Sequence, residues 1–263
     1  GAAALGFLTE LPLKKFNKNK SENYFLTPKI LIRYSPTHMR NVNSGRLSYN
    51  NLFDINKVNE IDVIENGLSM SLGFNYSASK VNAKKKTELE KFSFSMGQVV
   101  SDGENADMPS STSLDQKFSD VVGVSTVNIG ENSNFNYNFS IDQNYKDFNY
   151  NEIGVDYKFN DSKFKIDYLQ EKNHIGNNEF AKVNFDFAVS DSTEFNFGTK
   201  RNLLTNSAEF YNLSYTYLND CLKAGLVFRR EFYSDKDIEP EESLMFKISI
   251  VPFADIKSPK VFN

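Results

Sequence analysis

The sequence Asn-Phe-Asn-Tyr-Asn-Phe-Ser-Ile-Asp at residues 134–142 alternates polar and apolar side chains without a break. Successive side chains of a β-strand point to opposite faces, so this stretch predicts a strand with one apolar and one polar face. The same pattern returns at 151–159 and at 183–189. A sheet of many such strands needs an apolar medium on one side and water on the other. That requirement is typical of a membrane-spanning β-barrel, whose strands are about 9–11 residues long.

The composition is compatible with this interpretation. The chain has 263 residues, enough for one large domain or two small ones, and a formal net charge of -4. It contains no run of 18 apolar residues, which excludes a transmembrane helix. The mean hydropathy of -0.49 does not exclude a membrane, because alternation averages to a low value. The mild acidity argues against a nucleic-acid partner, which requires a concentrated basic patch.

Aromatic residues are abundant, with 24 Phe, 13 Tyr and no Trp. Phe and Tyr pack well on a pleated sheet, and Tyr suits the membrane–water interface. An A·T-rich genome, whose codons favour Phe, Tyr, Asn, Lys and Ile, explains the same composition equally well. It does not explain the alternation.

The alternation divides the chain into roughly a dozen expected strands, with no convincing helix. A strand is expected at 29–34, another is possible at 5–13 with an interruption at Pro12, and the regular pattern starts at Leu68. Residues 37–66 and 101–119 are expected to be long loops. Further strands are expected at 68–76, from 92, and at 121–129, 134–143, 151–159, 163–171, 180–189, 193–200, 208–218, 221–232 and 243–251. Short turns alternate with longer connections, as in outer-membrane barrels.

Catalytic and metal-binding motifs are missing from the sequence. His38 and His174 have no recognisable motif around them, so we expect ordinary loop histidines, no enzyme activity and no cofactor. The acidic run Glu239-Pro240-Glu241-Glu242 either binds a divalent cation or is a solvated loop, which is the preferred reading. The run Lys84-Lys85-Lys86 either contacts lipid phosphates or, as preferred, is a charged hairpin tip. The single cysteine, Cys221, excludes both an internal disulfide and a cysteine-rich metal site.

Several segments in order resemble a known family. They are Pro28–Pro36 with His38–Asn41, Asn51–Asp54 continuing through Asn59–Gly67, Phe94–Gln98, Ser113–Gly123 and Asn219–Leu222. Their order and spacing resemble the C-terminal barrel region of the lipopolysaccharide-assembly outer-membrane protein family LptD, also called the organic solvent tolerance protein family. The sequence looks most like an alphaproteobacterial version. The resemblance extends over nearly the whole chain, 1–263.

The resemblance implies an architecture and a function. Family members carry an N-terminal periplasmic jellyroll and a barrel of about two dozen strands. The present chain then corresponds to the C-terminal part of the barrel, without the jellyroll and the first strands. The start Gly1-Ala2-Ala3-Ala4-Leu5 does not read as an intact signal peptide, which fits a fragment.

The resemblance also implies partners. Lipopolysaccharide reaches the jellyroll over a periplasmic protein bridge, and its lipid part enters the outer leaflet through a lateral gate between the first and last barrel strands. A plug lipoprotein of the LptE kind fills the barrel, the barrel-assembly machinery inserts it, and outer-membrane lipids surround it. The location implied is the cell outer membrane of a Gram-negative bacterium.

Two sites follow from the resemblance residue by residue. The family's final strand, one lip of the gate, corresponds to alternating apolar residues that end at a proline: Leu244, Phe246, Ile248, Ile250 and Pro252. The alternative is that this strand is only the last barrel strand and an assembly signal. Cys221 corresponds to a cysteine that the family bonds to the jellyroll, and a buried free thiol is the alternative. Because Cys221 is out of phase with Leu222 and Ala224, we expect it to face away from lipid.

Other functions remain open at this point. A dozen strands can close alone as a small general porin or solute channel, which is the main alternative. A soluble β-protein, such as an adhesin, would bury its Phe and Tyr residues against a second sheet. An enzyme is the least favoured class because no catalytic constellation is present.

Overall fold

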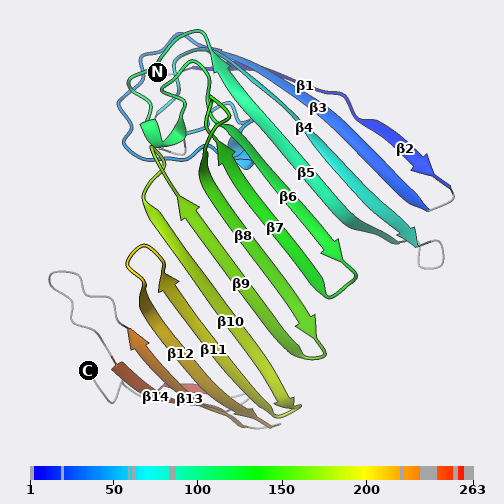
Figure 1. Cartoon of the computed structure of the whole chain (residues 1–263), viewed down its shortest axis with the longest axis vertical. Coiled ribbons are helices and arrows are strands. Elements are labelled where there is room, and N and C mark those ends of the chain that lie inside the picture. Colours follow the sequence, from blue (N-terminus) through cyan, green and yellow to red (C-terminus); the bar gives the residue numbers. More distant parts are fainter. Residues whose placement is uncertain are drawn as a thin grey trace. The chain divides into compact units, whose positions relative to one another are not determined.

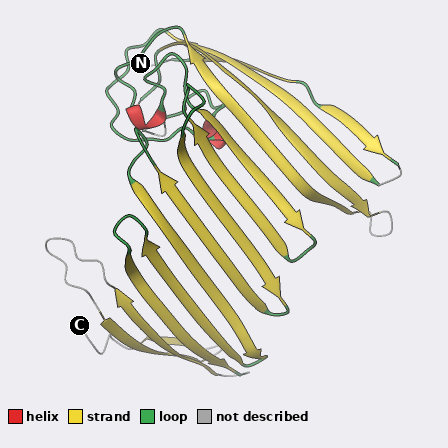
Figure 2. Ribbon diagram, viewed as in Figure 1, coloured by secondary structure: helices red, strands yellow, loops and turns green. Residues whose placement is uncertain are grey.

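The computed structural model describes residues 3–18, 21–58, 60, 63–82, 87–219, 222–231, 242–250 and 254–257. These residues are almost entirely β-strands and loops, so the all-β prediction is confirmed (Figure 2). The helical turns among them are η1 (Tyr49–Asn51) and η2 (Ser110–Thr112), each a single 3₁₀ turn. Within the described ranges, no helix is long and apolar enough to cross a membrane.

The chain divides into two compact units. The first consists of Gly1–Glu131, Phe135–Glu152 and Gln170–Asn177. Its strands run in the order β1-β3-β4-β5-β6-β7, and β2 pairs separately with β3 (Figure 1). Their bounds are β1 (Leu5–Glu10), β2 (Leu13–Asn17), β3 (Glu22–Ser35), β4 (Gly67–Asn82), β5 (Thr87–Ser101), β6 (Val121–Ile129) and β7 (Ser133–Ile141).

The second unit holds the later strands. It consists of Asn132–Asn134, Ile153–Leu169 and Asn178–Asn263, so β8 (Phe148–Phe159) begins in the first unit and continues in the second. From β10 to β15 each strand pairs antiparallel with the next. The bounds are β9 (Ser162–Glu171), β10 (Asn178–Ser190), β11 (Thr193–Asn202), β12 (Ser207–Leu218), β13 (Leu222–Glu231), β14 (Glu242–Ile250) and β15 (Ala254–Lys257).

The strands predicted from residue 121 onward match β6 to β14 within a few residues. The described residues form a sheet of 15 strands, slightly more than the roughly dozen expected. Part of the difference is that β1 and β2 are two halves of one interrupted strand, both paired with β3. The other part is β15, a short strand that alternation over four residues could not reveal.

The interruption between β1 and β2 has a local cause in β3. Pro28 lies in the middle of β3 and has no N–H to donate. Its carbonyl accepts a hydrogen bond from the Leu11 amide, with an N···O distance of 3.1 Å, so the proline ring faces the break at Leu11-Pro12. On its other side, Pro28 keeps its register with Phe74 of β4. Both prolines therefore lie at the break between β1 and β2, where neither needs to donate a ladder bond.

The strands of the first unit have two different faces. One face, here called the apolar face, carries large apolar side chains in cross-strand register: Phe7 and Ile32, Ile32 and Met70, Tyr34 and Leu68. Many of its side chains are exposed, with Phe7 at 71% and Ile32 at 46% of their maximum. So large an exposed apolar surface marks contact with a partner or with lipid.

The opposite face, here called the capped face, carries small residues under the long loops. Gly73 of β4 and Gly97 of β5 are direct cross-strand partners. A Cβ added at Gly97 would overlap Leu52, and one added at Gly73 would lie 3.1 Å from the Phe53 ring. The two glycines therefore form a depression that receives Leu52 and Phe53, which follow η1 in the loop of residues 36–66. Leu52 is fully buried there.

Candidate functional site

Two loops cover the capped face and form a single packed layer, here called the loop cap (residues 36–66 and 102–120). They lie at the same end of their strands (Figure 1). Their apolar side chains form one buried cluster with side chains of β5 and β6: Met39, Val42, Leu47, Leu52, Val58, Val63, Val99, Met108, Leu114 and Val122. Hydrogen bonds join the two loops, because the Val42 amide donates to the Asp107 carbonyl at 3.0 Å and the Ser111 hydroxyl donates to the Gly45 carbonyl at 2.8 Å.

A buried charged cluster ties the loop cap to β3. The Arg33 guanidinium donates to the Glu65 carbonyl at 2.6 Å and lies 3.3 Å from the Glu65 carboxylate. The Lys57 ammonium lies 3.5 Å from the same carboxylate, and the Lys57 amide also donates to it. The side chains of Arg33, Lys57 and Glu65 are 1%, 0% and 5% exposed. Two buried cations thus share one carboxylate, and burial lowers the pKa of Lys57.

A second polar cluster centres on Asp120, the last residue of the loop cap. Its carboxylate accepts hydrogen bonds from the Ser140 hydroxyl at 2.7 Å and from the side-chain amide of Asn149 at 2.9 Å. His174, in the loop after β9, places its Nε2 atom 3.1 Å from the same carboxylate. That distance suits an ion pair, although the orientation does not make a hydrogen bond. The buried Asp120 carboxylate therefore connects the loop cap to β7, to β8 and to the loop that follows β9.

The charge of His174 depends on this cluster. Its contact with Asp120 raises the pKa of His174 against the opposing effect of burial, and Asp115 and Asp142 add attraction. Burial also raises the pKa of Asp115. The cluster therefore favours an imidazolium that holds the loops together.

The strands of the second unit carry a polar face suited to hydrogen bonding with a hydrated ligand. Asn196, Gly198 and Lys200 of β11 alternate with the exposed phenylalanines Phe195 and Phe197. Lys200 forms an ion pair of 2.7 Å with Glu209. A shallow cleft of about 290 Å³ on this unit is lined mainly by Asn, Lys and Asp side chains: Asp156, Lys158, Lys163, Lys165, Asn184, Asp186 and Asn196.

The predicted gate residues lie together on β14. Leu244, Phe246 and Ile248 pair with Phe228, Leu226 and Ala224 of β13, and with Ile250 they share one face. Phe246 is 48% and Ile250 45% exposed. The sequence predicted that this strand is the last, but β15 pairs with it from Ile250↔Ala254 to Lys247↔Lys257. A proline such as Pro252 ends a ladder, yet it does not prevent the following residues from pairing back onto the strand.

Other predicted site residues lie outside the described residues: Lys84, Lys85, Lys86, Cys221, Glu239, Pro240, Glu241 and Pro252. His38 is described and is an exposed loop residue. In the described part of the chain, no group of three or more His, Cys, Asp and Glu side chains is placed to hold a metal ion.

Sequence reasoning missed the two buried polar clusters. His174 was expected to be an ordinary loop histidine, but it is paired with Asp120, 54 positions earlier in the chain. The sequence offered one signal for the other cluster. Arg33 stands in phase with Leu31 inside the otherwise apolar stretch of residues 30–34, and a charge at such a position needs a partner.

The chain was compared with known proteins. The family model described as "LptD: LPS transport system D" matches residues 9–200. No curated protein matches the sequence. A solved structure described as "Asymmetric conductivity of engineered proteins" is 8% identical, with a TM-score of 0.33 over 95% of each chain. A triple mutant of the Rhodopseudomonas blastica porin is 7% identical, with a TM-score of 0.32 over 95% of this chain and 94% of the other. TM-scores this low support no inference about the chain.

The charged cluster predicts losses of stability of very different size for two neutralising substitutions. Glu65→Gln leaves Arg33 and Lys57 buried without a counter-charge and should lower the free energy of unfolding by about 3–5 kcal/mol. Lys57→Met keeps the apolar stem and the Arg33–Glu65 pair, so its cost should be below about 1 kcal/mol. Guanidinium unfolding of the full-length protein in detergent measures both. Equal losses would show that the two cations do not share the carboxylate.

The Asp120 cluster predicts a pH-dependent stability. The pKa of His174 is raised on folding, so its stabilisation is fully present below about pH 6.5, the unfolded value. It is lost as the pH rises through the higher folded value. The midpoint of unfolding should therefore fall as the pH rises above about 6.5, and His174→Gln should flatten this fall. His38→Gln is the matched control, and an equally flat profile in that variant would contradict the assignment to His174.

Proposed function

The chain belongs to the LptD family of lipopolysaccharide transport proteins, and from that premise we propose how its two-faced sheet serves transport. The family match places the protein in the outer membrane of a Gram-negative bacterium, as a β-barrel component of lipopolysaccharide transport. It is a transport family rather than an enzyme family.

The observation that carries the proposal is the opposite chemistry of the two sheet faces. The exposed aromatic and aliphatic residues of the apolar face suit contact with lipid chains, since a membrane strand alternates lipid-facing and interior residues. The amide, hydroxyl and lysine groups of the opposite face suit hydrogen bonds to sugars. We propose that the acyl chains of lipopolysaccharide move along the apolar side while its saccharide passes along the polar side.

We propose that β14 and β15 form one lip of a lateral gate between the first and last strands of the barrel. The register supports this, because among the described residues β14 has nine pairs with β13 but only four with β15. Each backbone pair left open in lipid is costly, so a terminal strand held by a short ladder can be displaced at the edge of the lip at lower cost than a fully paired one. The exposed residues Phe246 and Ile250 and the half-buried residues Leu244 and Ile248 would meet the acyl chains, with Pro252 following in the sequence.

The larger assembly is also a proposal. We propose that residues 1–263 form the C-terminal part of a larger barrel that is preceded by a periplasmic jellyroll, into which the lipopolysaccharide bridge delivers its cargo. A plug lipoprotein of the LptE kind would occupy the barrel, and the barrel-assembly machinery would insert it. Membership of a lipopolysaccharide transport family supports the proposal of these partners.

Cys221 offers a test of the link to the jellyroll. If Cys221 bonds to a cysteine of that domain, the full-length protein should migrate differently on reducing and non-reducing gels. Cys221→Ser should abolish the difference. A non-reducing pattern that is unchanged by Cys221→Ser would exclude the bridge and leave the free-thiol alternative.

The gate predicts a transport-dependent contact at Phe246. Phe246, Leu226, Tyr215 and Phe195 stand in one cross-strand row, and Phe195 is exposed to a similar extent, so it is a matched control. A photo-crosslinking phenylalanine analogue at Phe246 should capture newly made lipopolysaccharide, and the signal should fall when supply to the barrel is blocked. The signal at Phe195 should not respond. If both positions respond equally, the gate does not lie at β14.

A further inference from the structure

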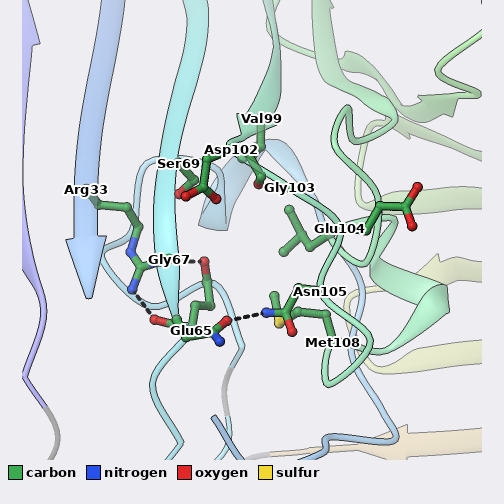
Figure 3. A pocket seen from close by; sticks show the side chains of 13 residues that line it. Arg33, Glu65, Gly67, Ser69, Val99, Asp102, Gly103, Glu104, Asn105 and Met108 are labelled. Atoms are coloured by element: carbon green, nitrogen blue, oxygen red, sulfur yellow. Dashed lines mark hydrogen bonds and ion pairs between the residues drawn. The ribbon is translucent and has the colours of Figure 1, made fainter. Parts of the chain in front are cut away.

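A cavity of about 260 Å³ lies between the capped face and the loop cap of the first unit (Figure 3). Arg33, Ser69 and Ser101 line it from β3, β4 and β5, where they occupy one cross-strand row. Residues 102–105 of the loop cap close the opposite side. A cavity of this volume has room for several ordered waters, and therefore for a group of the size of one sugar ring.

Two buried polar atoms beside this cavity lack hydrogen-bond partners among the described residues. They are the Arg33 Nε atom and the Ser69 hydroxyl oxygen. Arg33 is 1% and Ser69 6% exposed, and the two residues are direct cross-strand neighbours. An unsatisfied donor in so buried a position is unfavourable, and such groups call for a ligand or an ordered water. Both residues line the same cavity, so one ligand can serve both.

The remaining walls are polar on one side and apolar on the other. Asp102 lies beside Ser69, and Asn105 donates to the Asn66 side chain at 2.6 Å (Figure 3). Glu104 points away from the cavity in the same view. Val99, Met108 and Leu114 supply buried apolar surface. A sugar ring has the matching chemistry, with hydroxyls at its edge and C–H groups on its faces.

Charge argues against simpler ligands. Arg33 and Lys57 share the single carboxylate of Glu65, and Asp102 adds a negative charge that balances the second cation, so a free phosphate or carboxylate gains no net attraction. A divalent cation would be repelled by the positive charge of the buried Arg33 guanidinium. A neutral polyhydroxyl group avoids both conflicts, because it accepts from Arg33 and donates to Asp102.

We propose that this cavity binds one sugar ring of the lipopolysaccharide as its saccharide passes the capped face. The inference rests on the proposed transport function and adds a site to it. Access lies beside Asp102 and Gly103, which are exposed at the rim. A Cβ added at Gly103 meets nothing within 4 Å, so a larger side chain can enter the open space without disturbing the fold.

Photo-crosslinking in the full-length protein, in its native outer membrane, tests the site. A photo-crosslinking residue replaces Ser101 at the cavity, or Asn196 on the polar face of the second unit as a positional control. Lipopolysaccharide should be captured at Ser101. Gly103→Trp should lower that capture about tenfold, a loss equivalent to one or two hydrogen bonds, and Gly103→Ala should leave it nearly unchanged.

Competition experiments with the purified full-length protein show whether the saccharide or the lipid part of lipopolysaccharide gives the crosslinking signal. Excess saccharide released from the same lipopolysaccharide should compete with capture at Ser101, and the isolated lipid part should not. Competition by the lipid part alone would overturn the sugar assignment, and so would capture that Gly103→Trp does not reduce. Capture at Asn196 without capture at Ser101 would overturn this site and leave the proposed function intact. Capture at neither position would count against the proposed function itself.

Discussion

The structure depends on the two-residue period of its strands. A shift of register by one residue would move every apolar side chain to the polar side, so pairing is strongly specified wherever the faces differ. In the first unit this period places Ile32, Met70 and Leu68 on one face and Arg33, Ser69 and Ser71 on the other. The loop cap, the buried charges and the cavity all require the small and polar residues of the strands to lie on this second face.

The loop cap shows how a sheet with one face for lipid also gains a compact core. Strands that face lipid cannot bury their large side chains against each other, and in the first unit the buried apolar cluster lies mainly in loops. Gly73 and Gly97 allow the loops to approach the sheet closely. The charged cluster and the Asp120 cluster then fix the loops at two separate places, one near β3 and one near β7 and β8. The surface of this face is therefore shaped by loop side chains as well as by strands.

The sequence predicted what alternation encodes and missed what depends on distant partners. Strands such as 151–159 were recognisable because each carries its own periodic signal. The contacts of Lys57 with Glu65 and of Asp120 with His174 were not, because loops 36–66 and 102–120 have no period and their partners are set by tertiary packing. The short strand β15 was missed because four residues are too few for a pattern. The predicted gate residues were found on one face, although the strand that carries them is followed by another.

The most direct test of the two-faced sheet is a cysteine scan of β12 in native outer membranes, with Cys221 replaced by serine. Single cysteines at residues 211–217 would be treated with a water-soluble, membrane-impermeant thiol reagent. If one face of β12 lies in water and the other in lipid, the reagent should label Asn212, Ser214 and Thr216. Positions on the other face should be protected, namely Tyr211, Leu213, Tyr215 and Tyr217. Uniform labelling along the strand, or protection of every position, would contradict an apolar face in lipid and a polar face in water.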